Sequence, residues 1–278
     1  MNGNNFENRI APSTEVTFDK QRLFFNKWEM YKLLAQYDLP FQMPYTAIFS
    51  IQSFDQFTSR SIPFYVKPVH TWAGLHITRI TPFYNGYHVK QQNGSEETLP
   101  TKQALWQKLA QYYQNTLAII QQQAPTIAFN SRAFDIRVHL QRDEHGQWLY
   151  AGDLTRIGGE KSIVSNHFTN GGGVVETEFV LQHLFRYSKG NKVLRTLANA
   201  TFAISEVLDS QYPFVDIGAD FGLDRNGNLW LFEVNTNDAK GRPAYDLFKK
   251  LPDKNVYKQM IAMDKRRYKI WKKSNMYF

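Results

Sequence analysis

The chain has 278 residues, of which 42% are hydrophobic and 15% aromatic. This length and composition allow a substantial core in one composite domain or two small ones, and they exclude a disordered protein. The absence of cysteine excludes disulfides and thiolate metal sites. No apolar run is long enough to cross a bilayer, and the start of the chain, MNGNNFENRI, lacks the apolar core of a signal peptide. These features favour a cytoplasmic protein.

The net charge is +8, from 33 basic and 25 acidic residues, and it indicates an anionic partner. Much of this charge lies near the C-terminus, where ten Lys or Arg residues between Lys249 and Lys273 face only two acids, Asp253 and Asp264. Two interpretations stay open for this segment: a solvated helical tail, or a surface that contacts an acidic partner. No recognisable nucleic-acid motif accompanies it.

The first half of the chain alternates between helical and strand-like patterns. Residues 1–20 are polar and are expected to form an arm. Apolar residues at helical spacing predict a helix over 21–37, and the β-rich segment 62–69 predicts a strand. A hairpin that turns at Asn85-Gly86 should follow. A second amphipathic helix is predicted over 101–122.

The second half is richer in paired strands. Residues 133–158 predict two antiparallel strands joined near Glu144–Gly146, and a polar, glycine-bearing loop follows over 161–173. Helices are expected over 176–186 and 191–210. A last hairpin, FVDIGADFGLD and NLWLFEVN, should turn at Asn226-Gly227. This order predicts an α+β fold and argues against a Rossmann domain.

The last hairpin carries the clearest chemical signal. A turn near Arg225–Asn228 places Asp220 roughly opposite Glu233, and the period of two puts Asn235 on the same face as Glu233. Three oxygen-bearing side chains on one face suit a hard cation such as Mg²⁺, which would also relieve the repulsion between the two carboxylates. The alternative is an ordinary surface hairpin whose acids face water.

This hairpin resembles the signature of the ATP-grasp superfamily, in which an Asp is followed about a dozen residues later by Glu-x-Asn. A longer resemblance covers roughly residues 24–243 and concerns the YheC/YheD-type endospore coat-associated proteins. It rests on five motifs in the same order: FFNKWEMYKLLAQYDLPFQMPYT, FYVKPV, FDIRVHLQRD, SNHFTNGGG and DIGADFGLDRNGNLWLFEVN. The FDIR segment also resembles that of tubulin–amino-acid ligases.

The resemblance implies an α+β ATP-grasp fold, in which two α+β subdomains clamp a nucleotide. The expected divisions are an arm over 1–20, an ATP-grasp domain over 21–250 and a basic tail over 251–278. Within the domain, about 21–120 would form the first subdomain and 121–250 the second, which carries the metal site. The N-terminal pre-ATP-grasp domain of fuller ligases is expected to be missing or truncated. The acceptor surface would then come from another chain, or from the arm and the tail.

The resemblance also implies which residues bind Mg-ATP, with Asp220, Glu233 and Asn235 as the metal ligands. Lys67 and Lys27 would reach the phosphates, although a surface lysine at a strand end and a solvated helix face are the plainer interpretations. Arg137 would stabilise charge on the transferred phosphoryl group; the alternative is a structural ion pair with Asp135 or Asp216. The further ATP-binding candidates are Gln121 or Gln122 at the adenine, and Lys161, Asn166 and Gly171–Gly173 in a mobile loop.

One segment departs from the family pattern. After Lys67-Pro68 the chain reads HTWAGLHI, where relatives carry a glycine-rich stretch with a Gly-Lys-Gly-Ile-like end. Only Gly74 and Ile77 match, so the expected flexible cover over the phosphates is stiffened or repurposed.

Three functions follow from the resemblance. The first is an ATP-dependent carboxylate–amine or carboxylate–thiol ligase that forms an acyl-phosphate from Mg-ATP and releases ADP and phosphate. The second is a nucleotide-binding, spore-coat-associated protein without ligase turnover, and the third is a kinase that phosphorylates a hydroxyl. The implied substrates are small molecules or peptides with a carboxylate and an amine, for which Arg242 and Lys240 are candidate contacts. The basic tail would meet an acidic partner or spore coat proteins, in the cytoplasm or on the spore.

Overall fold

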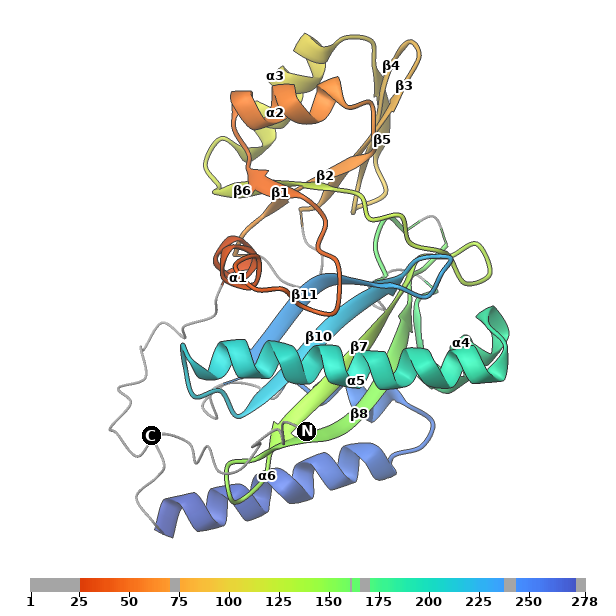
Figure 1. Ribbon diagram of the computed structural model, residues 1–278. Helices are drawn as coiled ribbons and strands as arrows, with labels where there is room; N and C mark the ends of the chain where they lie inside the picture. The colour runs from red at the N-terminus through yellow and green to blue at the C-terminus, as the bar shows by residue number, and fades with distance from the viewer. Residues whose placement is uncertain (1–25, 71–75, 161, 166–170, 238–243, 274–278) are drawn as a thin grey trace.

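The protein is built from two antiparallel sheets, one above the other in the view of Figure 1. A computed structural model describes residues 26–70, 76–160, 162–165, 171–237 and 244–273. The six-stranded sheet has the order β1-β6-β2-β3-β4-β5, and the five-stranded sheet has the order β11-β10-β7-β8-β9. Helices accompany both sheets, which confirms the predicted α+β class.

The first subdomain packs two helices on one face of the six-stranded sheet. Phe54 and Phe57 of one helix and Leu105 and Leu109 of the other are buried against Phe64 of the sheet. The elements are β1 (Thr46–Ile48), α2 (Ile51–Ser59), β2 (Phe64–Pro68), β3 (Thr78–Phe83), β4 (Gly86–Gln91), β5 (Glu96–Leu99), α3 (Lys102–Tyr113) and β6 (Ala118–Gln122). The strand over 62–69 and the hairpin at Asn85-Gly86 are thus confirmed.

The helix predicted over 101–122 is wrong in its second half. Helix α3 ends at Tyr113, and residues 118–122 form β6, between β1 and β2. Ile120 continues the helical spacing of α3 in sequence, but it is fully buried in the sheet core. Pairing on both edges satisfies every backbone group of a short apolar segment, so tertiary context overrides the local pattern. Gln121 and Gln122 therefore lie on a strand.

The second subdomain surrounds the five-stranded sheet. Both predicted hairpins and both predicted helices of this half are confirmed, the second helix starting a turn early. The elements are β7 (Phe134–Arg142), β8 (Trp148–Ile157), β9 (Gly173–Val175), α4 (Thr177–Leu184), α5 (Tyr187–Asp209), β10 (Asp216–Leu223), β11 (Leu229–Asn237), a 3₁₀ turn η1 (Asp246–Lys250) and α6 (Asn255–Lys273).

The two faces of this sheet differ in chemistry. Ile136 and Val138 of β7 point into the core beneath α5, whereas the alternate residues Asp135, Arg137 and His139 point to the opposite face. Strand β10 alternates in the same way, with Ala219 in the core. Turn η1 and α6 cover one part of the polar face through a small apolar cluster. The rest of that face holds the charged residues considered below.

Helix α1 (Lys27–Leu34) precedes the first sheet in sequence but packs in the core of the second. Met30 and Leu34 are buried there, and the Asn26 side chain caps the helix by accepting from two backbone N–H groups. The chain then pairs with β11, since Gln42 N–H donates to Leu229 O and Leu231 N–H donates to Gln42 O. Helix α1 therefore packs against the second subdomain beside β11 (Figure 1), and the backbone N–H of Lys27 also donates to Val69 O, just after β2.

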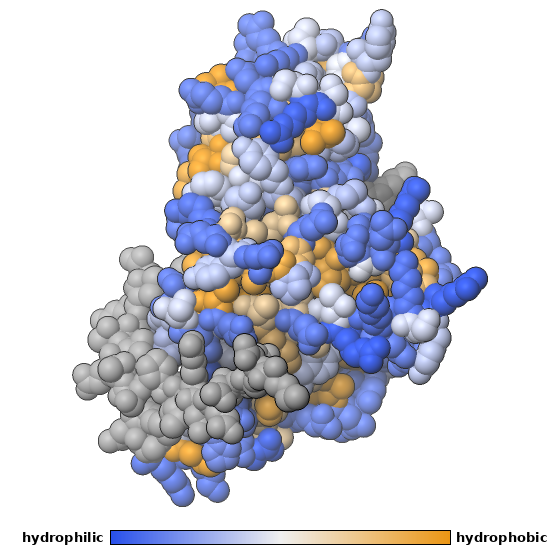
Figure 2. Space-filling model, viewed as in Figure 1, coloured by the Kyte–Doolittle hydropathy of each residue, from blue (hydrophilic) through white to orange (hydrophobic). Residues whose placement is uncertain are grey.

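The basic segment near the C-terminus is helical, and one face of it is packed. In α6, Met260 and Trp271 are buried, and Arg267 donates to the carbonyl of Arg142. Its lysines lie mostly on the exposed side. None of the helices in the described ranges is long and apolar enough to cross a membrane. Figure 2 shows a largely hydrophilic surface, on which apolar residues gather mainly between the first subdomain and α5.

The packing of α1 leads to a stability prediction. Leu34 is fully buried, so Leu34→Ala should lower the free energy of unfolding by about 2–5 kcal/mol through lost burial and a residual cavity. The exposed Gln36→Ala, two residues on, should change it by no more than about 0.5 kcal/mol. Urea denaturation measures both. Equal effects would mean that α1 is not part of the second core.

Candidate functional site

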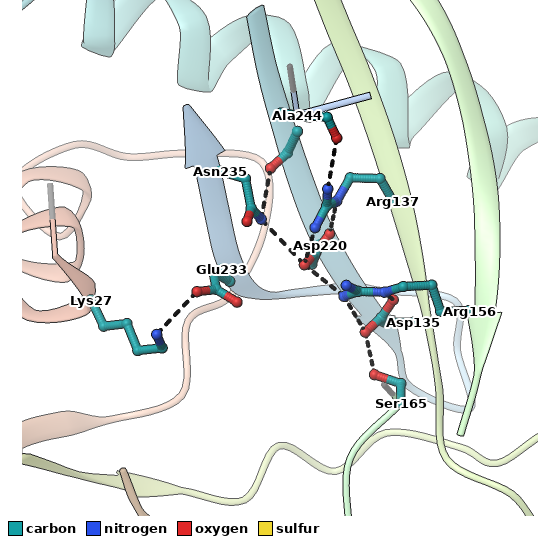
Figure 3. Close-up of polar contacts among 10 residues, drawn as sticks. Lys27, Asp135, Arg137, Arg156, Ser165, Asp220, Glu233, Asn235 and Ala244 are labelled. Atoms are coloured by element: carbon teal, nitrogen blue, oxygen red, sulfur yellow. Dashed lines mark hydrogen bonds and ion pairs between the residues drawn. The ribbon is translucent and has the colours of Figure 1, made fainter. Parts of the chain in front are cut away.

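The predicted metal-binding residues meet on the polar face of the second sheet. Asp220 on β10 lies opposite Glu233 on β11, as the hairpin predicted, and a bulge follows Asp220. Asn235 lies two residues along β11 from Glu233, and its Nδ2 is 3.4 Å from Asp220 Oδ2. Figure 3 shows Asn235 turned toward Asp220, while Glu233 on the same strand is turned toward Lys27. Their roles as metal ligands stay a prediction.

Asp220 is held by two arginines. Arg137 donates from Nε to Oδ1 and from Nη2 to Oδ2, the second at 2.9 Å, and Arg156 donates from Nη2 to Oδ2 at 2.6 Å. Arg137 thus has a structural ion pair, but its partner is Asp220 and not Asp135 or Asp216. The reason is register: Arg137 and Asp220 are direct partners across β7 and β10.

A second carboxylate completes this network. Asp135 accepts from Arg156 Nε at 2.6 Å and from Nη2 at 2.7 Å, and it also accepts from the Ser165 hydroxyl. The four charged side chains are 1–16% exposed. Two cations and two anions therefore neutralise one another in a buried place, the condition under which buried charges are tolerated.

The arginines also set the protonation of the two acids. Burial would raise the pKa of Asp220, but the guanidiniums of Arg137 and Arg156 more than offset this and hold it below its usual range. For Asp135, burial dominates and raises the pKa, with the negative charge of Asp220 adding to it and Arg156 opposing it. The negative charge of Asp220 is therefore stabilised more strongly than that of Asp135.

The backbone leaves room for this arrangement at Gly218. A Cβ built there would lie 2.9 Å from Arg137 Cδ, which is closer than real Cβ contacts. Gly218 lies on the same face as Asp220, two residues before it on β10, so the arginine side chain crosses the bare backbone to reach the carboxylate.

The donor set fits a hard cation in part. Glu233 and Asn235 offer side-chain oxygens on the partly exposed edge of the site, of the type that Mg²⁺ prefers. Both oxygens of Asp220, in contrast, already accept charge-assisted hydrogen bonds. Among the described residues no cluster of three or more His, Asp or Glu side chains could hold a metal. Asp220 would have to be released from an arginine before it could serve as a ligand.

Two lysines approach the same corner from different subdomains. Lys27 Nζ on α1 lies 3.1 Å from Glu233 Oε1 (Figure 3). The charges of Lys27 and Glu233 both act on Lys67, which lies on β2. Desolvation and the Lys27 ammonium lower the pKa of Lys67 to about 8, and the Glu233 carboxylate opposes this shift. An anionic ligand would stabilise the charged form of a lysine whose pKa is lowered by desolvation in this way.

The six-stranded sheet presents a second set of groups on the Lys67 face. Gln121 is paired with Tyr65, two residues from Lys67, and its side chain donates to Thr46 Oγ1 at 2.8 Å. Gln122 points to the opposite face by the period of two. Gln121 therefore lies on the same face of the sheet as Lys67, and Gln122 does not. Tyr65 reaches across to the second subdomain, with its hydroxyl 3.3 Å from the carbonyl of Ile163.

Four predicted residues lie outside the described ranges: Lys161, Asn166, Lys240 and Arg242. Most of the divergent HTWAGLHI segment does so too. The sequence did not single out Arg156 or Ser165, which the structure brings into the network. Arg156 carried a usable signal, because it stands among strand residues on β8 directly across from Asp135. Ser165 carried none, since its contact depends on the path of a loop.

The fold of this protein is similar to folds of known structure. The fold is similar to that of the D-cycloserine synthetase DcsG, with a TM-score of 0.51, 12% sequence identity and coverage of 87% of this chain and 70% of that one. A looser likeness links it to a D-alanine–D-alanine ligase from Bacillus anthracis complexed with ATP, with a TM-score of 0.43 and 14% identity over 88% of this chain and 66% of that one.

The chain belongs to the YheC/D-like ATP-grasp family, whose profile matches residues 16–264. The predicted family and the ATP-grasp fold are thereby confirmed. A curated relative, the endospore coat-associated protein YheD of Bacillus subtilis (strain 168), is 28% identical over 235 residues. That match covers 82% of this chain and 50% of the relative, so the chain spans about half the length of the curated protein it matches.

The close approach at Gly218 can be tested directly. Gly218→Ala should push Arg137 away from Asp220 and lower the free energy of unfolding by about 1–3 kcal/mol. Gly173→Ala is the matched control, because a Cβ there meets no atom within 4 Å, and it should be close to neutral. Denaturant titration distinguishes the two. If Gly218→Ala were also neutral, the network would tolerate loss of this packing.

The pKa of Lys67 predicts a pH dependence. Its ammonium is charged below about pH 8 and is lost above it, so affinity for a polyphosphate should fall as pH rises through 8. Between pH 7 and pH 9 the Kd for a fluorescent ATP analogue should rise about tenfold. Lys67→Arg should remove this dependence by keeping its charge, and Lys67→Met by losing it. A Lys67→Met profile that follows the wild type would assign the dependence to another group.

Proposed function

We propose that this protein is an ATP-dependent ligase that joins a carboxylate to an amine or a thiol through an acyl-phosphate. The single observation that carries the proposal is the meeting of Lys27, Glu233, Asn235 and the Arg137–Asp220 pair at one corner, with Lys67 facing them from the other subdomain. The family supplies the ATP-grasp fold on which such a corner binds a nucleotide.

Each group has a role that its chemistry supports. Lys27 and Lys67 would bind the β- and γ-phosphates as point charges, and Arg137 would hold the transferred phosphoryl group through its planar fork. Mg²⁺ would be held by Glu233 and Asn235, with Asp220 once it is released, and would neutralise phosphate charge. Gln121 would contact the adenine from β6.

The reaction needs no protein nucleophile. A substrate carboxylate oxygen attacks the γ-phosphorus, the bond to ADP breaks, and an acyl-phosphate forms. The amine or thiol then attacks the acyl carbon, the carbon–oxygen bond to phosphate breaks, and the nucleophile's proton passes to solvent or to the released phosphate. Binding between two subdomains would keep water from the acyl-phosphate.

A second function has an observation in its favour. Both oxygens of Asp220 are bonded to arginines, so one of the three expected metal ligands is occupied. The relative YheD is named as a coat-associated protein. Both facts suit a protein that binds a nucleotide without ligase turnover, for which tight ATP binding and no product across a broad acceptor screen is the expected result.

The ligase proposal predicts ADP release that depends on an acceptor. Purified protein with Mg-ATP should release ADP and phosphate only when a carboxylate and an amine substrate are both present. Glu233→Gln should lower this rate by about 100-fold or more through loss of a metal ligand. The matched control is Glu206→Gln, the same chemical change on the exposed side of α5, which should leave the rate unchanged.

The products decide between the alternatives. Release of AMP in place of ADP would contradict the acyl-phosphate scheme. A stable phosphorylated product, without free phosphate, would assign the protein to the kinases.

A further inference from the structure

We infer that Arg137 blocks Asp220 as a metal ligand in the nucleotide-free protein, so that a divalent cation enters the site only with a nucleotide. This inference rests on the proposed function for its biological meaning, because it concerns the order in which the same site fills. It does not depend on turnover, since it concerns binding and not the chemical step.

The block follows from the division of hydrogen bonds at Asp220. Arg137 binds both carboxylate oxygens, whereas Arg156 reaches only Oδ2 and spends its remaining contacts on Asp135. Among the described residues, Arg137 is the side chain that donates to Oδ1 of Asp220. Removing Arg137 would free that oxygen, while removing Arg156 would leave both oxygens covered.

Electrostatics adds to the obstruction. A bare divalent cation approaching Asp220 would meet two guanidiniums and, beyond Glu233, the Lys27 ammonium, and these positive charges would repel it. The other two expected ligands are Glu233, whose Oε1 already pairs with Lys27, and Asn235, and two such donors make a weak site on their own.

A nucleotide removes both obstacles at once. Phosphate oxygens match the bidentate fork of an arginine as well as a carboxylate does, so they can draw Arg137 away from Asp220. Their negative charge also offsets the cation that accompanies them. The site would thus exchange an arginine for a metal at Asp220 as the phosphates arrive, and the two ligands would bind cooperatively.

Mn²⁺ binding without nucleotide tests the inference by electron paramagnetic resonance on the full chain. The wild type should show no saturable binding below millimolar Mn²⁺. Arg137→Gln should bind Mn²⁺ at least tenfold more tightly, and the double variant with Asp220→Asn should lose the gain. Arg156→Gln is the matched control: it removes the same charge from the same network but leaves both oxygens of Asp220 covered, so it should show little gain.

The outcomes distinguish an effect of direct contact between Arg137 and Asp220 from an effect of net charge. Equal gains in Arg137→Gln and Arg156→Gln would overturn the inference, because net charge and not contact with Asp220 would then govern binding. A folded Arg137→Gln protein without any gain would overturn it as well. If Arg137→Gln fails to fold, the wild type decides: saturable Mn²⁺ binding that Glu233→Gln abolishes contradicts the block, and no binding in either protein supports it.

Failure of this inference is distinct from failure of the proposed function. Mn²⁺ binding to the nucleotide-free protein says nothing about turnover, and ADP release says nothing about which ligand enters first. A protein that binds nucleotide and never reacts would still carry the block.

Discussion

A buried network of two arginines and two aspartates on one face of the five-stranded sheet constrains the rest of the site. Alternation along β7 places Asp135 and Arg137 on that face, and alternation along β10 adds Asp220. Charges this deep are tolerated only when they neutralise one another, so Arg156 must come from the next strand to balance the second acid. Because these four charges neutralise one another, a charged ligand would bind beside them, at the β11 edge near Glu233 and Lys27.

The two subdomains contribute differently to this corner. Lys27 comes early in the chain, yet α1 is anchored in the second core by Met30 and Leu34, and its ammonium pairs with Glu233 there. Lys67 belongs to the six-stranded sheet and faces the same charges across the space between the sheets. Lys27 also connects the two sheets, because its backbone N–H donates at 3.3 Å to the carbonyl of Val69, just after β2.

Family membership and site chemistry support different parts of the functional account. The family match establishes an ATP-grasp fold, and the curated relative YheD is named as an endospore coat-associated protein. The choice between ligase and non-catalytic binder depends on local charges, because a fold by itself does not fix a reaction. Here the decisive feature is Asp220, which is a predicted metal ligand of the hairpin and also accepts hydrogen bonds from two arginines.

The sequence by itself determined the hairpin, the pairing of Asp220 with Glu233, the helices of the second half and the family, because these depend on local periodicity and on short motifs in order. It did not determine that Ile120 and Gln121 lie on a strand, since a helical spacing and a buried central strand share the same apolar residues and only pairing with β1 and β2 separates them. The packing of α1 in the second core was equally hidden, because a core is chosen by contacts distant in sequence. Above all, only the tertiary structure decided the partner of Arg137. Three aspartates were within reach on chemical grounds, and the register of β7 against β10 selected Asp220.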